Sequence, residues 1–370
     1  MPVPLLAPRG AYRVLLGIVV AGLLLAGAAR VGNVQAPPAF ASLVAQLSEP
    51  GGYFDTDNLI SNERSYLHVV PALRDPGLAG GAYIGVGPDQ NFSYIAQVRP
   101  GIAFIVDLRR DNLLLHLVFK ALFSMSETRV DYLSLLFGRA IPPKLADWQR
   151  ADLDAIIDHV AGPRLPEAAI TELRERVDAR IESFGLSLSE ADLETIDRFH
   201  RRFISAGLAL KFQTTGRQPQ SYYPSYRDLL NETDRQLQRR NYLASEDDFQ
   251  FVRSLQQRDL VVPVVGDLAG PSALAAIAAL MTSRGDRLSA FYASNVEFYL
   301  FGAGTFPAFV DNLKRLPRRD RSLMIRSVFG ALGQSAPGYY SSSLVQPVDE
   351  LLQGYAAGRF HRYPELTVSR

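Results

Sequence analysis

The stretch that decides the fold runs from Gly81 to Leu122 and reads GAYIGVGPDQNFSYIAQVRPGIAFIVDLRRDNLLLHLVFKAL. Its first apolar run, Ala82 to Gly85, stops at the glycine turn Gly85-Val86-Gly87. Residues 90–98 then carry aromatic and aliphatic side chains at helical spacing. This half of the stretch predicts a short strand, a tight turn and a helix.

The second half of the stretch repeats the pattern and adds an acid. Residues 102–106 form a continuous apolar run, which is typical of a strand covered on both faces, and Asp107 follows it directly. Residues 112–122 are again helical by period. Glycines after the first strand let backbone approach a ligand, and an acid at the tip of the second can accept hydrogen bonds from a ribose diol. We therefore expect a nucleotide-like or nucleoside-like ligand over Gly85, Gly87 and Asp107, with a plain tight turn as the alternative.

Beyond this stretch the chain returns to alternating strands and helices after a long helical interval. The further predicted elements are strands at 260–265, 288–294 and 322–329, with helices at 271–281, 306–316 and 348–355. Helical segments separated by prolines occupy about 127–258. We expect an α/β fold with a Rossmann-like, mostly parallel sheet, helices on both faces, and this interval as a large helical insertion.

The N-terminus has the pattern of an export signal. Two arginines precede the apolar run from Val14 to Ala29, which as a helix would span about 24 Å. Ala26-Gly27-Ala28 is typical of a cleavage site. We expect residues 1–36 to be a cleaved signal peptide or an uncleaved membrane anchor plus a linker, and residues 37–370 to be the α/β domain. Both alternatives export the domain to the cell envelope, with membrane contact through residues 14–29 if uncleaved; a cytoplasmic location requires a misassigned start codon.

Composition excludes several classes of chemistry. The net charge of +1 gives the chain no bias toward nucleic acid, and we expect no nucleic-acid partner. There is no cysteine, which excludes a thiol nucleophile, cysteine-bound metal and disulfides. The five histidines are scattered without metal-ligand spacing, so we expect no metal site.

The strand ends resemble those of class I S-adenosylmethionine-dependent methyltransferases. The first ends in the glycine turn, the second in Asp107, the third in Gly266-Asp267, and the fourth in the polar segment Ser294 to Glu297. The chain also resembles an uncharacterised bacterial family with a methyltransferase-like fold. The segments that carry this second resemblance are 61–63, 85–96, 107–112, 263–274 and 291–301.

The resemblance implies S-adenosylmethionine as cofactor and assigns residues to three roles. Gly85, Gly87, Asp107 and Asp267 would bind the methyl donor; Asn295 and Glu297 would be catalytic; Asn62 and Glu63 would face the acceptor. Glu297 is the candidate general base. The acceptor would be an unidentified small molecule or envelope component. The alternative is an envelope binding or scaffold protein that retains the fold without catalysis.

Each candidate also has a purely structural interpretation. Asp107 could pair with an arginine that follows it, Asp267 could cap the next helix, and residues 61–63 could form a helix cap. His116 is better explained as a core histidine than as a catalytic one. The tyrosines of the polar loop 213–226 could line a pocket or pack over a domain edge.

Overall fold

In the part of the chain that the structure describes, six strands form one sheet in the order β3-β2-β1-β4-β5-β6. The first five run parallel, and β6 is antiparallel to β5. The strands are β1 (Ala82–Gly85), β2 (Ile102–Asp107), β3 (Val261–Val265), β4 (Leu288–Ser294), β5 (Arg318–Phe329) and β6 (Ser341–Pro347). The predicted α/β class with a mostly parallel sheet is confirmed.

The computed structural model describes residues 1, 39–215, 218, 220–330 and 337–367. The apolar run from Val14 to Ala29 lies outside the described residues, and so does the expected cleavage site. Within the described ranges, no helix is both long and apolar enough to cross a bilayer. The described residues from Phe40 onward form one unit.

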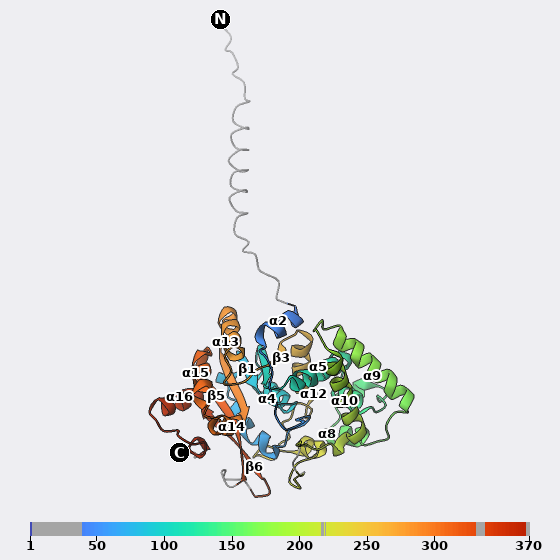
Figure 1. Ribbon diagram of the computed structural model, residues 1–370. Coiled ribbons are helices and arrows are strands. Elements are labelled where there is room, and N and C mark those ends of the chain that lie inside the picture. The colour runs from blue at the N-terminus through green and yellow to red at the C-terminus, as the bar shows by residue number, and fades with distance from the viewer. Residues whose placement is uncertain (2–38, 216–217, 219, 331–336, 368–370) are drawn as a thin grey trace. The chain divides into compact units, whose positions relative to one another are not determined.

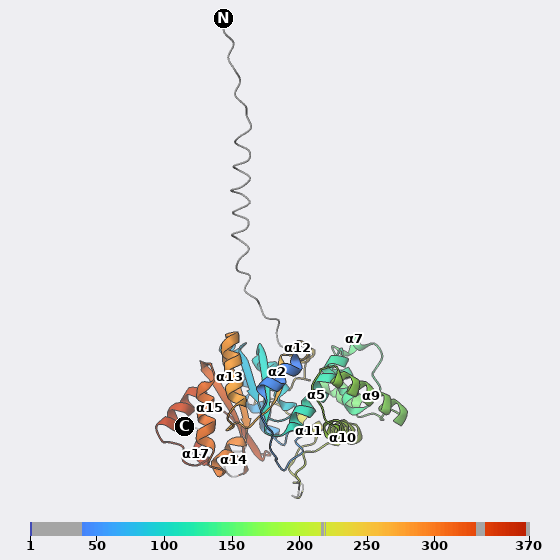
Figure 2. The same ribbon diagram turned by 45° about the horizontal axis from the view of Figure 1, so that its top comes forward.

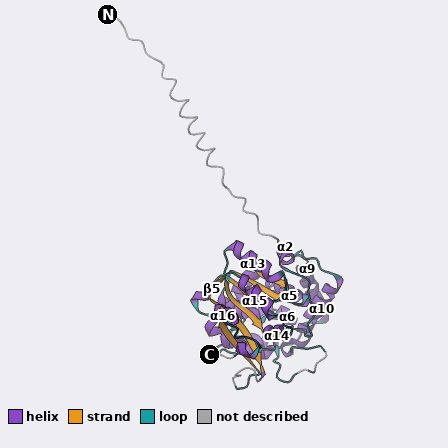
Figure 3. Ribbon diagram, turned by 60° about the vertical axis from the view of Figure 1, so that its left-hand side comes forward, coloured by secondary structure: helices purple, strands orange, loops and turns teal. Residues whose placement is uncertain are grey.

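Helices cover the sheet on both sides. Between β1 and β3, helices α4 (Gln90–Val98) and α5 (Arg110–Met125) contact the strands, and α12 (Glu246–Gln257) packs on these two helices. Helices α13 (Ala273–Arg284) and α15 (Phe306–Arg315) connect β3 to β4 and β4 to β5, and they pack against each other. Figure 2 shows α13 and α15 on one side of the strands and α5 on the other. The orange strands lie among these helices in Figure 3.

The helical insertion is built outward from α5. This helix is buried on nearly all sides, because it contacts β2 and β3 on one side and α9, α10 and α12 on the others. The insertion extends beyond the sheet on the side of α8, α9 and α10 (Figure 1). Besides α12, its helices are α6 (Arg129–Phe137), α7 (Leu145–Trp148), α8 (Leu153–Val160), α9 (Glu167–Glu182), α10 (Glu190–Ala206), the 3-10 helix η3 (Gly207–Ala209) and α11 (Tyr226–Asn231).

The remaining helices precede β1 or follow β4 in the chain. They are α2 (Phe40–Leu47), η1 (Arg64–Val69), α3 (Val70–Leu73), η2 (Pro76–Leu78), α14 (Val296–Gly302), α16 (Val348–Ala356) and α17 (Pro364–Thr367). Helix α2 packs on β3 and α13, and α16 packs on β5 and β6.

The edge strand β6 was not predicted from the sequence, in which the last predicted elements are the strand at 322–329 and the helix at 348–355. Its first residues, Ser341 to Ser343, are polar and lack the apolar alternation of a strand. They are nevertheless buried. The Ser65 hydroxyl from η1 lies 3.1 Å from that of Ser341 and 3.2 Å from that of Ser343, so these two hydroxyl groups have a hydrogen-bond partner inside the fold. Ser65, which is distant in the chain, thus provides a hydrogen-bond partner for Ser341 and Ser343, whose polar side chains would be expected at the surface from the sequence pattern alone.

Glu49 links the end of α2 to the loop between β3 and α13. Its Oε2 accepts hydrogen bonds from the Ser272 amide at 3.0 Å, the Ser272 hydroxyl at 2.7 Å and the Ala273 amide at 3.1 Å. Its Oε1 accepts from the Asp267 amide at 2.9 Å. A Cβ on Gly270 would lie 2.0 Å from this Oε1, so a side chain at this position would displace the carboxylate. The carboxylate therefore occupies the N-terminus of α13, where the helix dipole favours an anion.

We predict that Glu49→Ala lowers the free energy of unfolding by about 1–2 kcal/mol, because backbone donors at a helix start lose their acceptor. Urea denaturation measures the change. The matched control is Glu194→Ala, an exposed glutamate on α10, which should change stability by less than about 0.5 kcal/mol. Equal effects of the two replacements would contradict the capping role.

Candidate functional site

A cavity of about 460 Å³ lies at the carboxyl ends of the parallel strands. Four strand ends line it: residues 86–88 after β1, 107–109 after β2, 266–268 after β3, and 294–296 at the end of β4. The strand order reverses between β1 and β4, which is where open α/β sheets leave a crevice for ligands. The volume is within the range of about 300–1,000 Å³ common for small-molecule sites.

Most of the residues selected from the sequence meet at this cavity, although they come from distant segments. The residues that line it are Asn62, Glu63, Gly87, Asp107, Asp267 and Asn295. Gly85 and Glu297 are not part of its lining.

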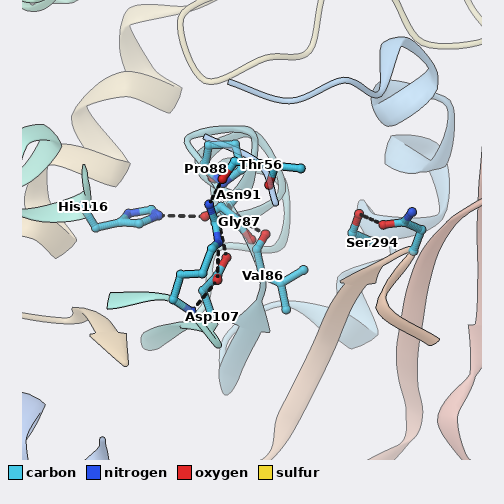
Figure 4. A network of polar contacts seen from close by, with 10 residues as sticks. Thr56, Val86, Gly87, Pro88, Asn91, Asp107, His116 and Ser294 are labelled. Atoms are coloured by element: carbon cyan, nitrogen blue, oxygen red, sulfur yellow. Dashed lines mark hydrogen bonds and ion pairs between the residues drawn. The ribbon is translucent and has the colours of Figure 1, made fainter. Parts of the chain in front are cut away.

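The turn after β1 is held by side chains from two helices. Gly87 has φ +81°, a conformation that residues with a Cβ rarely adopt. Its carbonyl lies 2.9 Å from Nε2 of His116 on α5 (Figure 4). The amide group of Asn91 on α4 donates to the carbonyls of Val86 and Pro88, each at 2.8 Å. The backbone of the turn is therefore fixed in the position where it lines the cavity.

Gly85 has a packing role beneath this turn. A Cβ at Gly85 would lie 1.9 Å from Oδ1 of Asn91 and 2.7 Å from the Tyr83 hydroxyl. These two groups are hydrogen bonded to each other at 2.8 Å, with Tyr83 as the donor. The absence of a side chain at Gly85 thus makes room for the Asn91 side chain that holds the turn, and not for a ligand as the resemblance implies.

Asp107 lines the cavity together with its partner Arg109. Its Oδ1 accepts from the Arg109 amide at 2.9 Å and from Nε at 3.1 Å, and its Oδ2 accepts from Nη2 at 3.0 Å. Nη1 of Arg109 donates to the Thr56 carbonyl at 2.8 Å (Figure 4). The arginine pairing foreseen as the structural interpretation is present. Because a carboxylate has about four acceptor positions, Asp107 retains capacity for a further donor.

Glu63 is buried at the wall of the cavity among neutral donors. Its Oε2 accepts from Gln90 at 3.0 Å, from the Tyr292 hydroxyl at 2.7 Å and from the Ser327 hydroxyl, and its Oε1 accepts from Ser294. The side chain is about 1 % exposed, and no ion pair among the described residues includes it. These partners were not identified from the sequence, because Tyr292 and Ser327 lie within predicted strands.

The other polar residues of the cavity have fewer contacts. Asn295 Oδ1 accepts from the Ser294 hydroxyl at 3.4 Å (Figure 4). Asp267 Oδ1 accepts from the Ala269 amide at 2.8 Å, which is a local turn contact before α13. Asn62 lines the cavity beside Glu63. These side chains can offer further hydrogen bonds to a bound molecule.

Glu297 lies outside the lining of the cavity and forms a buried ion pair with Arg326. Oε2 lies 2.6 Å from Nε of Arg326, and Oε1 lies 3.1 Å from Nη2. Both side chains are fully buried, and Arg326 Nη1 also donates to Gln346 at 2.9 Å. A carboxylate in this position lacks the contact with the cavity that a general base needs. The predicted catalytic role of Glu297 is therefore replaced by a structural one.

Aromatic side chains form much of the remaining wall, and most of them were not selected from the sequence. Tyr222 stacks on Tyr340 with ring centroids 3.7 Å apart, and Phe54 meets Tyr299 edge-on at 4.9 Å. The other aromatic residues of the lining are Phe212, Tyr223, Tyr292 and Phe329. Tyr222 and Tyr223 line the cavity as one interpretation of the 213–226 loop allowed, whereas Tyr226 is buried and donates to Asp89 at 2.6 Å.

The family described as "Domain of unknown function (DUF7790)" matches residues 58–140 and 197–355. These segments make up more than half of the chain, and the chain belongs to this family. They contain the ends of β1 to β4 that line the cavity. The unmatched interval 141–196 contains α7, α8, α9 and the start of α10, which do not line it. No curated protein matches the chain.

We predict that His116 makes native stability depend on pH. Burial lowers the pKa of His116 to about 4, although the Gly87 carbonyl acts in the opposite direction. In the unfolded chain the pKa is about 6.5, so at intermediate pH the unfolded state binds a proton that the native state does not. The stabilisation is present above pH 6.5 and is lost as the pH falls to about 4, by up to about 3 kcal/mol.

Chemical denaturation across this pH range, on the wild type and on His116→Gln, tests the effect. The variant should lose less stability on acidification than the wild type. Burial also raises the pKa of Asp89 to about 6, so protonation of Asp89 stabilises the native state as the pH falls. This contribution is present in both proteins and cancels when the slopes of stability against pH are compared. Replacement of the exposed His361 is the control. Parallel pH profiles for wild type and His116→Gln would contradict the assignment.

We predict that Glu297→Ala lowers the free energy of unfolding by about 3–5 kcal/mol, because it leaves the Arg326 charge buried without its partner. The double variant Glu297→Leu/Arg326→Met should recover much of this loss, since it removes both charges. Urea denaturation of the single and double variants measures both effects. A cost below about 1 kcal/mol for the single variant would be inconsistent with a structural ion pair.

Proposed function

We propose that this protein binds S-adenosylmethionine in the cavity at the reversal of strand order and transfers its methyl group to a small-molecule or envelope acceptor. The observation that carries the proposal is the convergence of Gly87, Asp107, Asp267 and Asn295 on one cavity. They come from the ends of four adjacent strands, and this is the arrangement that the resemblance to class I methyltransferases implies.

The donor would lie over the ends of β1, β2 and β3. The turn at Gly87 brings backbone to the cavity surface without a side chain, so a ligand can approach it closely. Asp107 has acceptor capacity for a ribose hydroxyl beyond its bonds to Arg109. Asp267 and Leu268 line the wall after β3, where the resemblance implies that adenine is bound.

The acceptor would lie toward the ends of β4 and the segment before η1. Asn62, Glu63, Ser294 and Asn295 supply polar groups there. Methyl transfer from a sulfonium needs an aligned nucleophile more than a covalent catalyst, so positioning by these groups would supply much of the rate enhancement. The reaction proposed here does not use Glu297.

A second candidate function is ligand binding without catalysis. It is favoured by the arrangement of the acids: Asp107 is paired with Arg109, and the expected base Glu297 is paired with Arg326. Export to the envelope, as the N-terminal pattern predicts, would also separate the protein from a cytoplasmic methyl donor.

We predict saturable binding of S-adenosylmethionine to the full-length protein, measured by isothermal titration calorimetry. Asp107→Asn should raise Kd by about tenfold or more, because a charged acceptor for the ribose is lost. The matched control is Asp75→Asn, which removes a carboxylate that pairs with Arg321 outside the cavity lining. The control should leave Kd unchanged.

The titration also separates the two candidate functions. Binding of the donor, followed by methyl incorporation into an extract of envelope components, supports the enzyme. Binding without incorporation supports the second candidate. No heat with millimolar donor would retire S-adenosylmethionine as the ligand.

A further inference from the structure

The lining of the cavity is strongly biased toward negative charge. Its carboxylates are Glu63, Asp107 and Asp267, and Arg109 is the one positively charged side chain among the described lining residues. Arg109 is already neutralised by Asp107 and gives a further hydrogen bond to the Thr56 carbonyl. Glu63 and Asp267 therefore remain without a positive partner among the described residues, and an anionic ligand would be repelled.

One helix terminus near the cavity, that of α13, is already occupied by an anionic side chain. Helix α13 begins just after the lining residues of the β3 end, and its first amides are bound by the carboxylate of Glu49. Gly270 gives that carboxylate its space, since a Cβ there would lie 2.0 Å from Oε1. A phosphate group would have to displace a side chain that the fold itself places there.

Glu63 is the residue best placed to bind a positive group. Its four hydrogen bonds come from an amide and three hydroxyl groups, all neutral, although its side chain is buried to about 1 % exposure. A buried carboxylate is costly unless it is paired. Here three of the four hydrogen bonds go to Oε2, whereas Oε1 accepts from Ser294 alone among its described partners and retains capacity for a positive group in the cavity that Glu63 lines.

The aromatic wall complements such a group. Phe54, Tyr222, Tyr299 and Tyr340 line the same cavity, and ring faces attract cations while offering apolar surface to the rest of a ligand. Negative charge together with several aromatic rings favours organic cations over phosphates and carboxylic acids.

We propose that this cavity selects ligands carrying an ammonium group, which pairs with Glu63 while an apolar or aromatic body packs against Phe54, Tyr222 and Tyr340. This inference rests on the proposed function in taking this cavity as the ligand site, and it assigns the acceptor or ligand class as amines. It also excludes phosphate-bearing cofactors such as dinucleotides from the cavity.

The test uses three probes of similar shape and different charge: phenethylammonium, 2-phenylethanol and 3-phenylpropionate. Titrated into the full-length protein at neutral pH, the amine should bind at least about tenfold more tightly than the alcohol, and the acid should show no saturation. Equal affinity for the three, preference for the acid, or no binding of the amine at millimolar concentration would overturn the proposal.

Variants then assign the charge selectivity to Glu63. Glu63→Gln should reduce the preference for amine over alcohol to about unity, while Asp89→Asn should retain it. Asp89 is the matched control, because it is also buried, is also bonded by hydroxyl groups, and does not line the cavity. Retained preference in a folded Glu63→Gln protein would overturn the role of Glu63. If Glu63→Gln does not fold, the three probes on the wild type still decide the proposal.

The outcome is separable from that of the proposed function. A protein that binds S-adenosylmethionine but does not discriminate among the probes retains the proposed function and loses this inference. A protein that prefers the amine but gives no heat with the methyl donor retains this inference and loses the donor.

Discussion

Burial of the central strands on both faces is the constraint on which the rest of the structure depends. The side chains of β1, β3 and most of β2 and β4 are buried, so helices must cover both sides of the sheet. Right-handed connections place α4 and α5 on one side and α13 and α15 on the other. After β3 the chain returns to the middle of the sheet and places β4 beside β1. The strand order therefore reverses between β1 and β4, and the cavity lies at this reversal.

The walls of the cavity are held in place by hydrogen bonds from specific side chains. Asn91 and His116 hold the Gly87 turn, Glu49 holds the loop after β3, and Arg109 holds Asp107. Each contact joins a strand end to a different helix or loop. A site built this way is fixed before a ligand arrives, which reduces the entropy cost of binding.

The acids of this region differ in function because they differ in partners. Glu49 accepts hydrogen bonds from a helix start, Asp107 pairs with an adjacent arginine, and Glu297 pairs with a buried arginine. The described hydrogen-bond donors to the Glu63 carboxylate are all neutral groups. Residue type and chain position do not distinguish these situations, which arise from the groups that tertiary packing brings to each carboxylate.

The sequence by itself determined the strand and helix pattern from Gly81 to Leu122, the later strand Leu288–Ser294, and the gathering of Gly87, Asp107, Asp267 and Asn295 at one edge of the sheet. These follow from local hydrophobic period and from the rule that parallel strands end at the same edge. Only the tertiary structure decided that Gly85 makes room for Asn91, that Glu297 pairs with Arg326, and that β6 is a strand. The physical reason is that each of these outcomes depends on a second group, and for Arg326 and for the Ser65 partner of β6 that group lies far away in the chain, beyond the reach of any local pattern.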